Sequence, residues 1–185
     1  MNKAASAARG AAQVSVLDGA RIPGLAARIK ASGAGNRCLF QGTSEEELSD
    51  VAPYLVALEP ESDLAQWIFG EGWGASWGVH LVTTASLDEV RAHLRRFLMV
   101  LDHLGKQLYF RLYDPRVLRV FLPTCDAEQL KMLFGPIGAF IVESEDPATA
   151  LAFSLDGDTL QTKTLPALSK ILWKGKREKL DADHS

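Results

Sequence analysis

Two aspartates and one arginine are the side chains in this sequence whose types could carry out phosphoryl transfer or hydrolysis. Asp18 follows a β-prone run and precedes Gly19, and a carboxylate beyond the carboxyl end of a strand can hold a metal ion or attack a phosphoryl group. Asp114 and Arg116 flank Pro115 further along the chain. The run around Asp18 lacks the second aspartate of the usual phosphotransfer loop, and no histidine is near Asp114 in sequence. The competing interpretation is that Asp18 accepts backbone N–H groups and Asp114 caps a turn.

The other residue types that carry out chemistry are scattered along the chain. The two cysteines and four histidines do not have the spacing of metal ligands. Ser76 lies in a Gly-x-Ser-x-Gly pattern at residues 74–78, but a predicted strand follows it and not the helix that a serine nucleophile turn requires. We therefore predict a protein that is not an enzyme, with no catalytic residue, no bound metal and no cofactor. A phosphoryl-transfer or hydrolase enzyme using Asp18, Asp114 and Arg116 is the alternative.

A glycine-rich stretch at residues 70–78 contains Trp73 and Trp77. It has neither the Gly-Lys-Ser/Thr of a phosphate-binding loop nor the Gly-x-Gly-x-x-Gly of a dinucleotide loop. Glycines that adopt positive φ, with the tryptophans packed on the core, would explain the composition. An exposed tryptophan that anchors a partner protein is the second possibility.

Arginines gather in two further stretches. One stretch combines arginines with Tyr113 and Asp114, and a structural ion-pair network at a strand-to-helix junction would explain it. The other lies on a predicted helix, away from the apolar stripe. Arginine and aromatic side chains are also the usual anchors of protein interfaces. Our predicted partner-binding residues are therefore Trp73, Trp77, Arg91, Arg95, Arg96, Arg111, Tyr113, Asp114, Arg116 and Arg119.

Composition excludes several classes of function. The chain has 185 residues and a formal net charge of -3, which disfavours nucleic-acid binding, although the last residues are basic. We expect no membrane association, because no run approaches the roughly 20 apolar residues that span a bilayer. No apolar segment of a secretory signal follows the Ala/Ser-rich start, so we expect reduced cysteines and a cytoplasmic location.

Periodicity and turn residues predict an α/β fold. Strands at 14–17, 38–40 and 54–58 alternate with helices at 23–31 and 44–51, and this rhythm with short loops favours a parallel sheet. A fourth strand is expected at 79–84, a long helix at 87–104 after the capping box of Ser86 and Glu89, and a strand at 107–113. Asp126 caps a later helix, and strands follow at 140–143, 151–155 and 160–164.

The expected architecture is a mainly parallel N-terminal sheet flanked by helices, with a smaller C-terminal lobe. We divide the chain into a flexible N-terminal lead-in (1–13), an α/β adaptor domain (14–145) and a short C-terminal hairpin with a basic tail (146–185).

An ordered set of short motifs over residues 14–154 resembles a known family. Its sharpest part is Phe110-Arg111-Leu112-Tyr113-Asp114-Pro115-Arg116, inside the block from Tyr109 to Leu118. The other motifs are Leu17-Asp18-Gly19-Ala20, Cys38-Leu39-Phe40, Ala52-Pro53-Tyr54-Leu55-Val56, Gly72-Trp73-Gly74, Ser76-Trp77-Gly78, Leu94-Arg95-Arg96-Phe97 and Phe134-Gly135-Pro136. Together they are similar to a domain of unknown function that was later tied to bacterial type VI secretion, the effector adaptors or chaperones of the Tap and VasW type.

This resemblance implies a role before secretion. Such an adaptor holds a cognate effector toxin in the cytosol and helps to load it on the spike protein at the tip of the injection tube. The expected partners are therefore that toxin and that spike protein, and no catalysis is implied. The chain is shorter past the shared domain than many members of the family.

Overall fold

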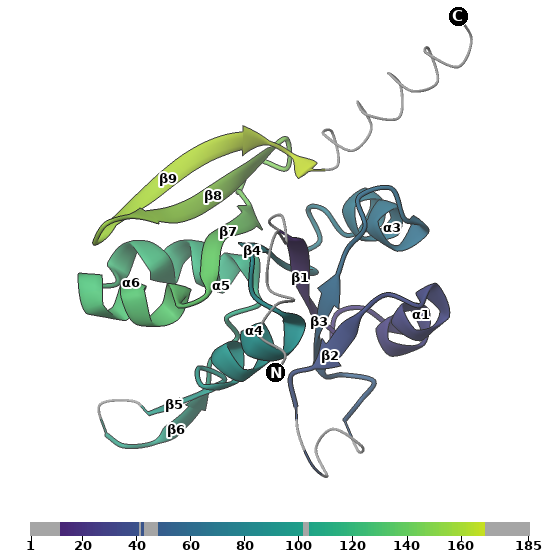
Figure 1. Ribbon diagram of the computed structural model, residues 1–185, viewed down its shortest axis with the longest axis horizontal. Helices are drawn as coiled ribbons and strands as arrows, with labels where there is room; N and C mark the ends of the chain where they lie inside the picture. Colours follow the sequence, from purple (N-terminus) through teal and green to yellow (C-terminus); the bar gives the residue numbers. More distant parts are fainter. Residues whose placement is uncertain (1–11, 41, 43–47, 102–103, 169–185) are drawn as a thin grey trace, which may run out of the picture.

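The computed structural model describes residues 12–40, 42, 48–101 and 104–168 (Figure 1). Most of the expected lead-in, the start of the expected helix at 44–51 and the basic tail lie outside these residues; within them, 48–51 form a turn. Seven strands form one sheet in the order β2-β3-β1-β4-β7-β8-β9. Their bounds are β1 Ala12–Asp18, β2 Asn36–Cys38, β3 Pro53–Ala57, β4 Gly78–Thr83, β7 Ile137–Glu143, β8 Thr149–Asp156 and β9 Thr159–Pro166.

Every pair of neighbouring strands in this sheet is antiparallel, so the predicted parallel sheet was wrong. Strands β1 and β2 run in the same direction, as do β3 and β4, but β3 lies between β1 and β2, and β1 lies between β3 and β4. The alternation of strands and helices therefore predicted the wrong direction for β3, which is antiparallel to β1 and β2, and the wrong neighbours in the sheet. Strands β8 and β9 continue the same sheet and do not form a separate lobe.

Most of the helices begin at a side chain that caps them. The capping boxes of Ser86 with Glu89 and of Asp126 with Gln129 are both present, as local side-chain chemistry predicts. None of the helices in the described part of the chain has the length and hydropathy to cross a bilayer. The helices are α1 Leu25–Ser32, α3 Asp63–Glu71, α4 Leu87–Arg95, α5 Pro115–Phe121 and α6 Ala127–Phe134, with a 3₁₀ turn at Leu122–Thr124.

The predicted long helix at 87–104 ends early, at Arg95. Its apolar stripe is buried as far as Leu98, whereas Leu104 is 80% exposed. The chain then forms a separate antiparallel hairpin of β5 (Met99–Leu101) and β6 (Gln107–Tyr109), with Gly105 at positive φ between them. The predicted strand at 107–113 likewise stops at Tyr109. Helical spacing of leucines was therefore a misleading signal beyond Leu98.

Helices cover both faces of the sheet (Figure 1). On one face, α1 and α3 pack over a core that includes Leu17, Val56 and Ile68. On the other, α4, α5 and α6 pack over a larger core that includes Phe140 and Leu94. Burial of these apolar side chains supplies the main stabilisation of the domain, and it fixes the ends of β1, β4 and β7, from which the candidate site is built.

Candidate functional site

Asp18 and Asp114, far apart in sequence, meet at one corner of the molecule. Asp18 ends β1 and Asp114 is the N-cap of α5, and both are almost fully buried. Arg21 joins them, because its guanidinium lies 3.8 Å from the Asp18 Oδ2 and 4.0 Å from the Asp114 Oδ2. We call the set of Asp18, Arg21, Arg111, Asp114 and Arg116 the arginine corner.

Asp114 is the better satisfied of the two carboxylates. Its Oδ1 accepts hydrogen bonds from the backbone N–H and the Nε of Arg116, each at 3.0 Å, and its Oδ2 accepts from the Arg116 Nη2 at 2.7 Å. Burial alone would raise the pKa of Asp114, but the hydrogen bonds and charge of Arg116 outweigh it, so the pKa lies below its ordinary value. This bidentate pair confirms that Asp114 caps α5 and binds Arg116.

Asp18 is held mainly by charge. Its Oδ1 accepts the N–H of Ala20 at 3.0 Å, as expected of a residue that caps a turn. Its Oδ2 is buried without a hydrogen bond within the described residues but faces Arg21 and, at 3.7 Å, the Nη2 of Arg111. Two buried carboxylates thus form ion pairs with three guanidinium groups, and the Arg111 and Arg116 side chains remain 44% and 49% exposed.

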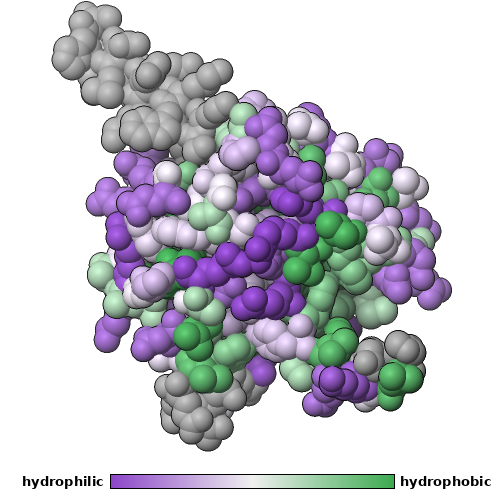
Figure 2. Space-filling view, turned by 180° about the vertical axis from the view of Figure 1, so that it is seen from behind, coloured by the Kyte–Doolittle hydropathy of each residue, from purple (hydrophilic) through white to green (hydrophobic). Residues whose placement is uncertain are grey.

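Aromatic and apolar side chains adjoin the arginine corner. The ring centroids of Tyr109 and Tyr113 lie 6.5 Å apart, and the partial burial of Tyr109, followed by the neighbouring Tyr113, raises the pKa of Tyr109. Among its described side chains, the hairpin bears four exposed apolar ones, which we call the hairpin surface: Met99, Leu104, Leu108 and Tyr109. Figure 2, which views the molecule from behind relative to Figure 1, shows hydrophilic side chains across the middle of that face, with hydrophobic groups on either side of them.

The glycine-rich stretch at 70–78 begins in the last turn of α3, continues as a loop that packs against this helix, and ends at the first residue of β4. Its Trp77 ring lies 4.6 Å from that of Trp67, and a Cβ added at Gly72 would clash with the Trp77 ring. Glycine at 72 is therefore required by close packing. We call residues 72–78 the tryptophan loop.

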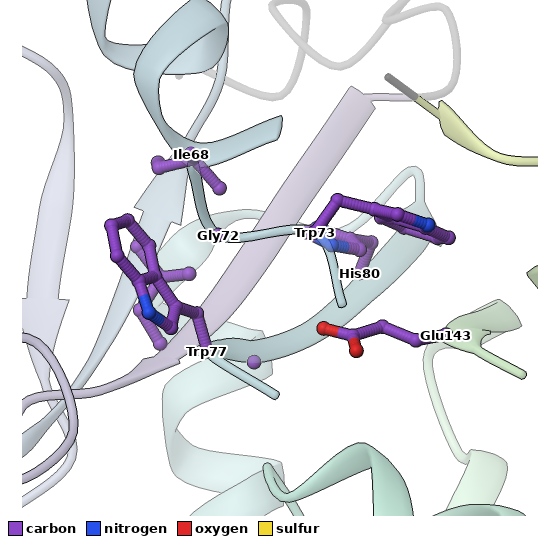
Figure 3. Close-up of a pocket in the computed structure, with 8 residues that line it drawn as sticks. Ile68, Gly72, Trp73, Trp77, His80 and Glu143 are labelled. Atoms are coloured by element: carbon purple, nitrogen blue, oxygen red, sulfur yellow. The ribbon is translucent and has the colours of Figure 1, made fainter. Parts of the chain in front are cut away.

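The rest of the tryptophan loop is fastened to β4 and to the chain after β7. Trp73 stacks on His80 with ring centroids 6.0 Å apart and donates its Nε1–H to the carbonyl of Pro147 at 2.9 Å. The Glu143 carboxylate accepts the backbone N–H of Ser76 at 3.0 Å, and it points towards the loop in Figure 3. Burial raises the pKa of Glu143, although backbone hydrogen bonds from Ser76 and Gly74 act to lower it.

The pocket beside the tryptophan loop is too tight to hold even a water-sized ligand. It is lined by Trp73, Trp77, His80 and Glu143, among others. Burial lowers the pKa of His80 to about 3, so the ring is neutral at physiological pH, and one ring nitrogen lies 2.7 Å from the Ser15 hydroxyl. Among the residues that the structure describes, no group of acids, histidines and cysteines is arranged to hold a metal ion.

The remaining predicted arginines lie elsewhere. Arg91 donates two hydrogen bonds to main-chain carbonyls at the end of β2. Arg95 is half-buried and Arg96 is exposed, with its guanidinium 5.8 Å from the ring of Phe97. Arg119 lies 3.6 Å from Glu145. The predicted residues therefore divide among the arginine corner with the adjoining Tyr113, the tryptophan loop, α4 with its C-cap Arg96, and Arg119 of α5.

Sequence reasoning missed Arg21, Glu143 and the pair of Ser15 and His80. A local signal existed for Arg21, because it lies three residues after Asp18. No local signal existed for Glu143, which reaches the tryptophan loop from a distant strand.

The fold and the corner define an antiparallel α/β domain with a fixed arginine cluster. The sequence profile of a family described as "Domain of unknown function (DUF4123)" matches residues 15–132, which is more than half of the chain, and the chain belongs to this family. Comparison with curated proteins and with solved structures finds no match. The matched range contains the arginine corner and the tryptophan loop, and it ends before β7, β8 and β9.

Proposed function

We propose that this protein is an adaptor, or chaperone, that binds a type VI secretion effector toxin in the cytosol and helps to load it on the spike protein. Membership of the DUF4123 family supports this role, because the ordered motifs of the chain resemble the effector adaptors of that family. The toxin and the spike protein are the proposed partners, and the work of the protein is binding.

The arginine corner together with the hairpin surface is the proposed contact for the toxin. The observation that carries this proposal is that exposed guanidinium groups are paired with carboxylates that are themselves buried. Side chains that are already ordered lose little conformational entropy on binding. Exposed apolar side chains of the hairpin lie on the same part of the chain, and this combination of arginine, tyrosine and apolar groups is typical of interface anchors.

Arg111→Ala tests the contact. We expect the variant to fold and to capture the co-expressed toxin of the neighbouring gene at least about tenfold less well, as for loss of an interface anchor. Arg37→Ala is the matched control, because the Arg37 side chain is 42% exposed and forms an ion pair with Asp88 away from the corner. Equal capture by both variants would remove the arginine corner from the proposed contact.

Catalysis at the same corner is the competing function. Asp18 and Asp114 do converge, as a phosphoryl-transfer or hydrolase site would require. However, arginines engage both carboxylates, which favours a structural ion-pair network. We therefore propose that the protein is not an enzyme, and steady hydrolysis of p-nitrophenyl phosphate that Asp18→Asn abolishes would contradict this.

A further inference from the structure

The two edges of the seven-stranded sheet differ in length and in whether their outward backbone groups are covered. One edge is β2, a strand of three residues, and the other is β9, a strand of eight residues. The outer edge of a sheet presents backbone N–H and C=O groups that can pair with another strand, and proteins normally shorten, cover or charge such edges.

The β2 edge is covered by a side chain. Leu39 donates its N–H to Pro53 of β3, so the neighbouring residues, Cys38 and Phe40, direct their carbonyls away from the sheet. Arg91 of α4 donates its Nε–H to the Cys38 carbonyl at 2.6 Å and its Nη2–H to the Phe40 carbonyl at 2.9 Å. A guanidinium group thus occupies the position that an additional strand would take.

The β9 edge has no such cover among the described residues. It pairs with β8 alone, in a register that is unbroken from Thr149↔Pro166 to Asp156↔Thr159, so no bulge turns the edge away. Figure 1 shows β9 at the outer side of the sheet. The strand is rich in β-branched threonine, is almost entirely exposed, and carries Lys163 as its one charge.

The register identifies the backbone groups that point outward. Ala167 donates its N–H to the Ala148 carbonyl, and bonded pairs recur at every second residue of an antiparallel ladder. The two-residue turn that contains Gly157, whose φ is 59°, is consistent with the same alternation of bonded and non-bonded pairs. The outward N–H and C=O groups are therefore those of Leu160, Thr162 and Thr164.

We infer that β9 is a docking edge for an extended segment of the secreted toxin, which adds to the sheet as an eighth strand. This inference rests on the proposed function for the identity of the partner. Main-chain hydrogen bonds to Leu160, Thr162 and Thr164 supply the affinity in this mode of recognition. The edge belongs to β7–β9, beyond the range matched by the family, so it suits a partner that is particular to this chain.

Charge favours a foreign strand over a second copy of β9. In the two antiparallel registers that overlap most of β9 with its own copy, Lys163 lies directly opposite or diagonal to the second Lys163, and like charges there are unfavourable. A toxin segment with an acidic residue opposite Lys163 gains a cross-strand ion pair instead. The occupant is therefore an extended segment with an acidic side chain at that position.

Residue-resolved amide hydrogen exchange on the full chain, alone and with the toxin encoded by the neighbouring gene, tests this inference. We expect the amides of Leu160, Thr162 and Thr164 to exchange freely in the chain alone and to become protected in the complex. Thr162→Pro removes an outward N–H without removing a bond to β8, and we expect it to lower toxin affinity at least about tenfold. Thr162→Ala keeps the N–H and serves as the control.

Each outcome of these experiments either supports or contradicts the docking edge. Capture of the toxin by the wild type without protection of these amides overturns the docking edge and leaves the adaptor function standing. Protection in the chain alone, with a doubled mass in solution, assigns the edge to a second copy and also overturns it. If the wild type captures no toxin, the adaptor function and the docking edge fail together. If Thr162→Pro loosens the β8–β9 hairpin, the exchange of the wild type still decides.

Discussion

The arginine corner and the tryptophan loop both stood out in the sequence as partner-binding candidates, yet they are built in opposite ways. In the corner, two buried aspartates hold guanidinium groups that remain exposed. In the loop, the half-buried rings of Trp73 and Trp77 pack against His80 and Trp67 and against the edge of the core. In the arginine corner, buried carboxylates position exposed guanidinium groups, whereas in the tryptophan loop aromatic side chains pack against the hydrophobic core.

Residue type alone therefore does not distinguish a binding surface from a structural part of the fold. Tryptophan and arginine are both favoured at interfaces, but the Trp73 Nε1–H already has an acceptor in Pro147. The exposed guanidinium groups of Arg111 and Arg116 can still meet an incoming partner. If this comparison is correct, changes in the loop should alter stability, and surface changes at the corner should alter binding.

The largest expected effect is that of Asp114→Ala. This change removes the cap of α5 and the buried carboxylate of the corner, so we expect the free energy of unfolding to fall by about 3–4 kcal/mol. Urea denaturation measures it. Asp88→Ala breaks an ion pair at the surface and is expected to cost far less. Comparable losses in the two variants would show that the corner is not held from within.

The pH dependence of stability distinguishes the tryptophan loop from the arginine corner, by a smaller effect. The pKa of His80 is lowered to about 3, whereas the unfolded chain binds the proton near pH 6.5. The stability that neutral His80 contributes is complete above pH 6.5 and is lost as the pH falls, by about 2 kcal/mol at pH 5. Asp114, whose pKa is lowered, loses its contribution only below its ordinary pKa of 3.8.

Urea midpoints of the wild type and His80→Gln between pH 7 and pH 5 check this prediction. Glu143 acts in the opposite sense, because its raised pKa reduces its contribution as the pH rises, and both proteins contain it. The wild type should lose more stability than the variant over this range. Parallel curves would mean that His80 is not held neutral by the tryptophan loop.

The smallest expected effect on stability is that of Leu104→Ser in the hairpin surface. Leu104 is 80% exposed, so the free energy of unfolding should change by no more than about 0.5 kcal/mol. Capture of the toxin should nevertheless fall several-fold if the hairpin surface is part of the contact. Met132→Ser, at an exposed apolar residue of α6, should leave capture unchanged. A titration of each variant with the toxin distinguishes them.

Local chemistry was the part of the structure that the sequence predicted well. The capping boxes at Ser86 and Asp126, the cap at Asp114 and its pair with Arg116 all depend on residues within three positions of one another. Side-chain hydrogen bonds over such short spans leave a readable spacing.

Long-range arrangement was not predictable in the same way. Strand β3 lies between β1 and β2 in the sheet. Both faces of β1 and β3 are buried, so their hydrophobic pattern is the same whether neighbouring strands are parallel or antiparallel. The meeting of Asp18 with Asp114 follows from that arrangement and not from spacing. The end of α4 at Arg95 was missed because the leucine stripe continues through a segment that instead forms the hairpin.

The hydrogen bond from Ser76 to Glu143 has a consequence for how the protein can be divided. Glu143 lies in β7, beyond residue 132 where the family match ends, yet it secures a loop inside the matched range. Phe140 and Val142 of the same strand are completely buried in the larger core. The smallest autonomously folding unit therefore extends through β7, and a fragment cut at the family boundary would expose its interior to proteolysis.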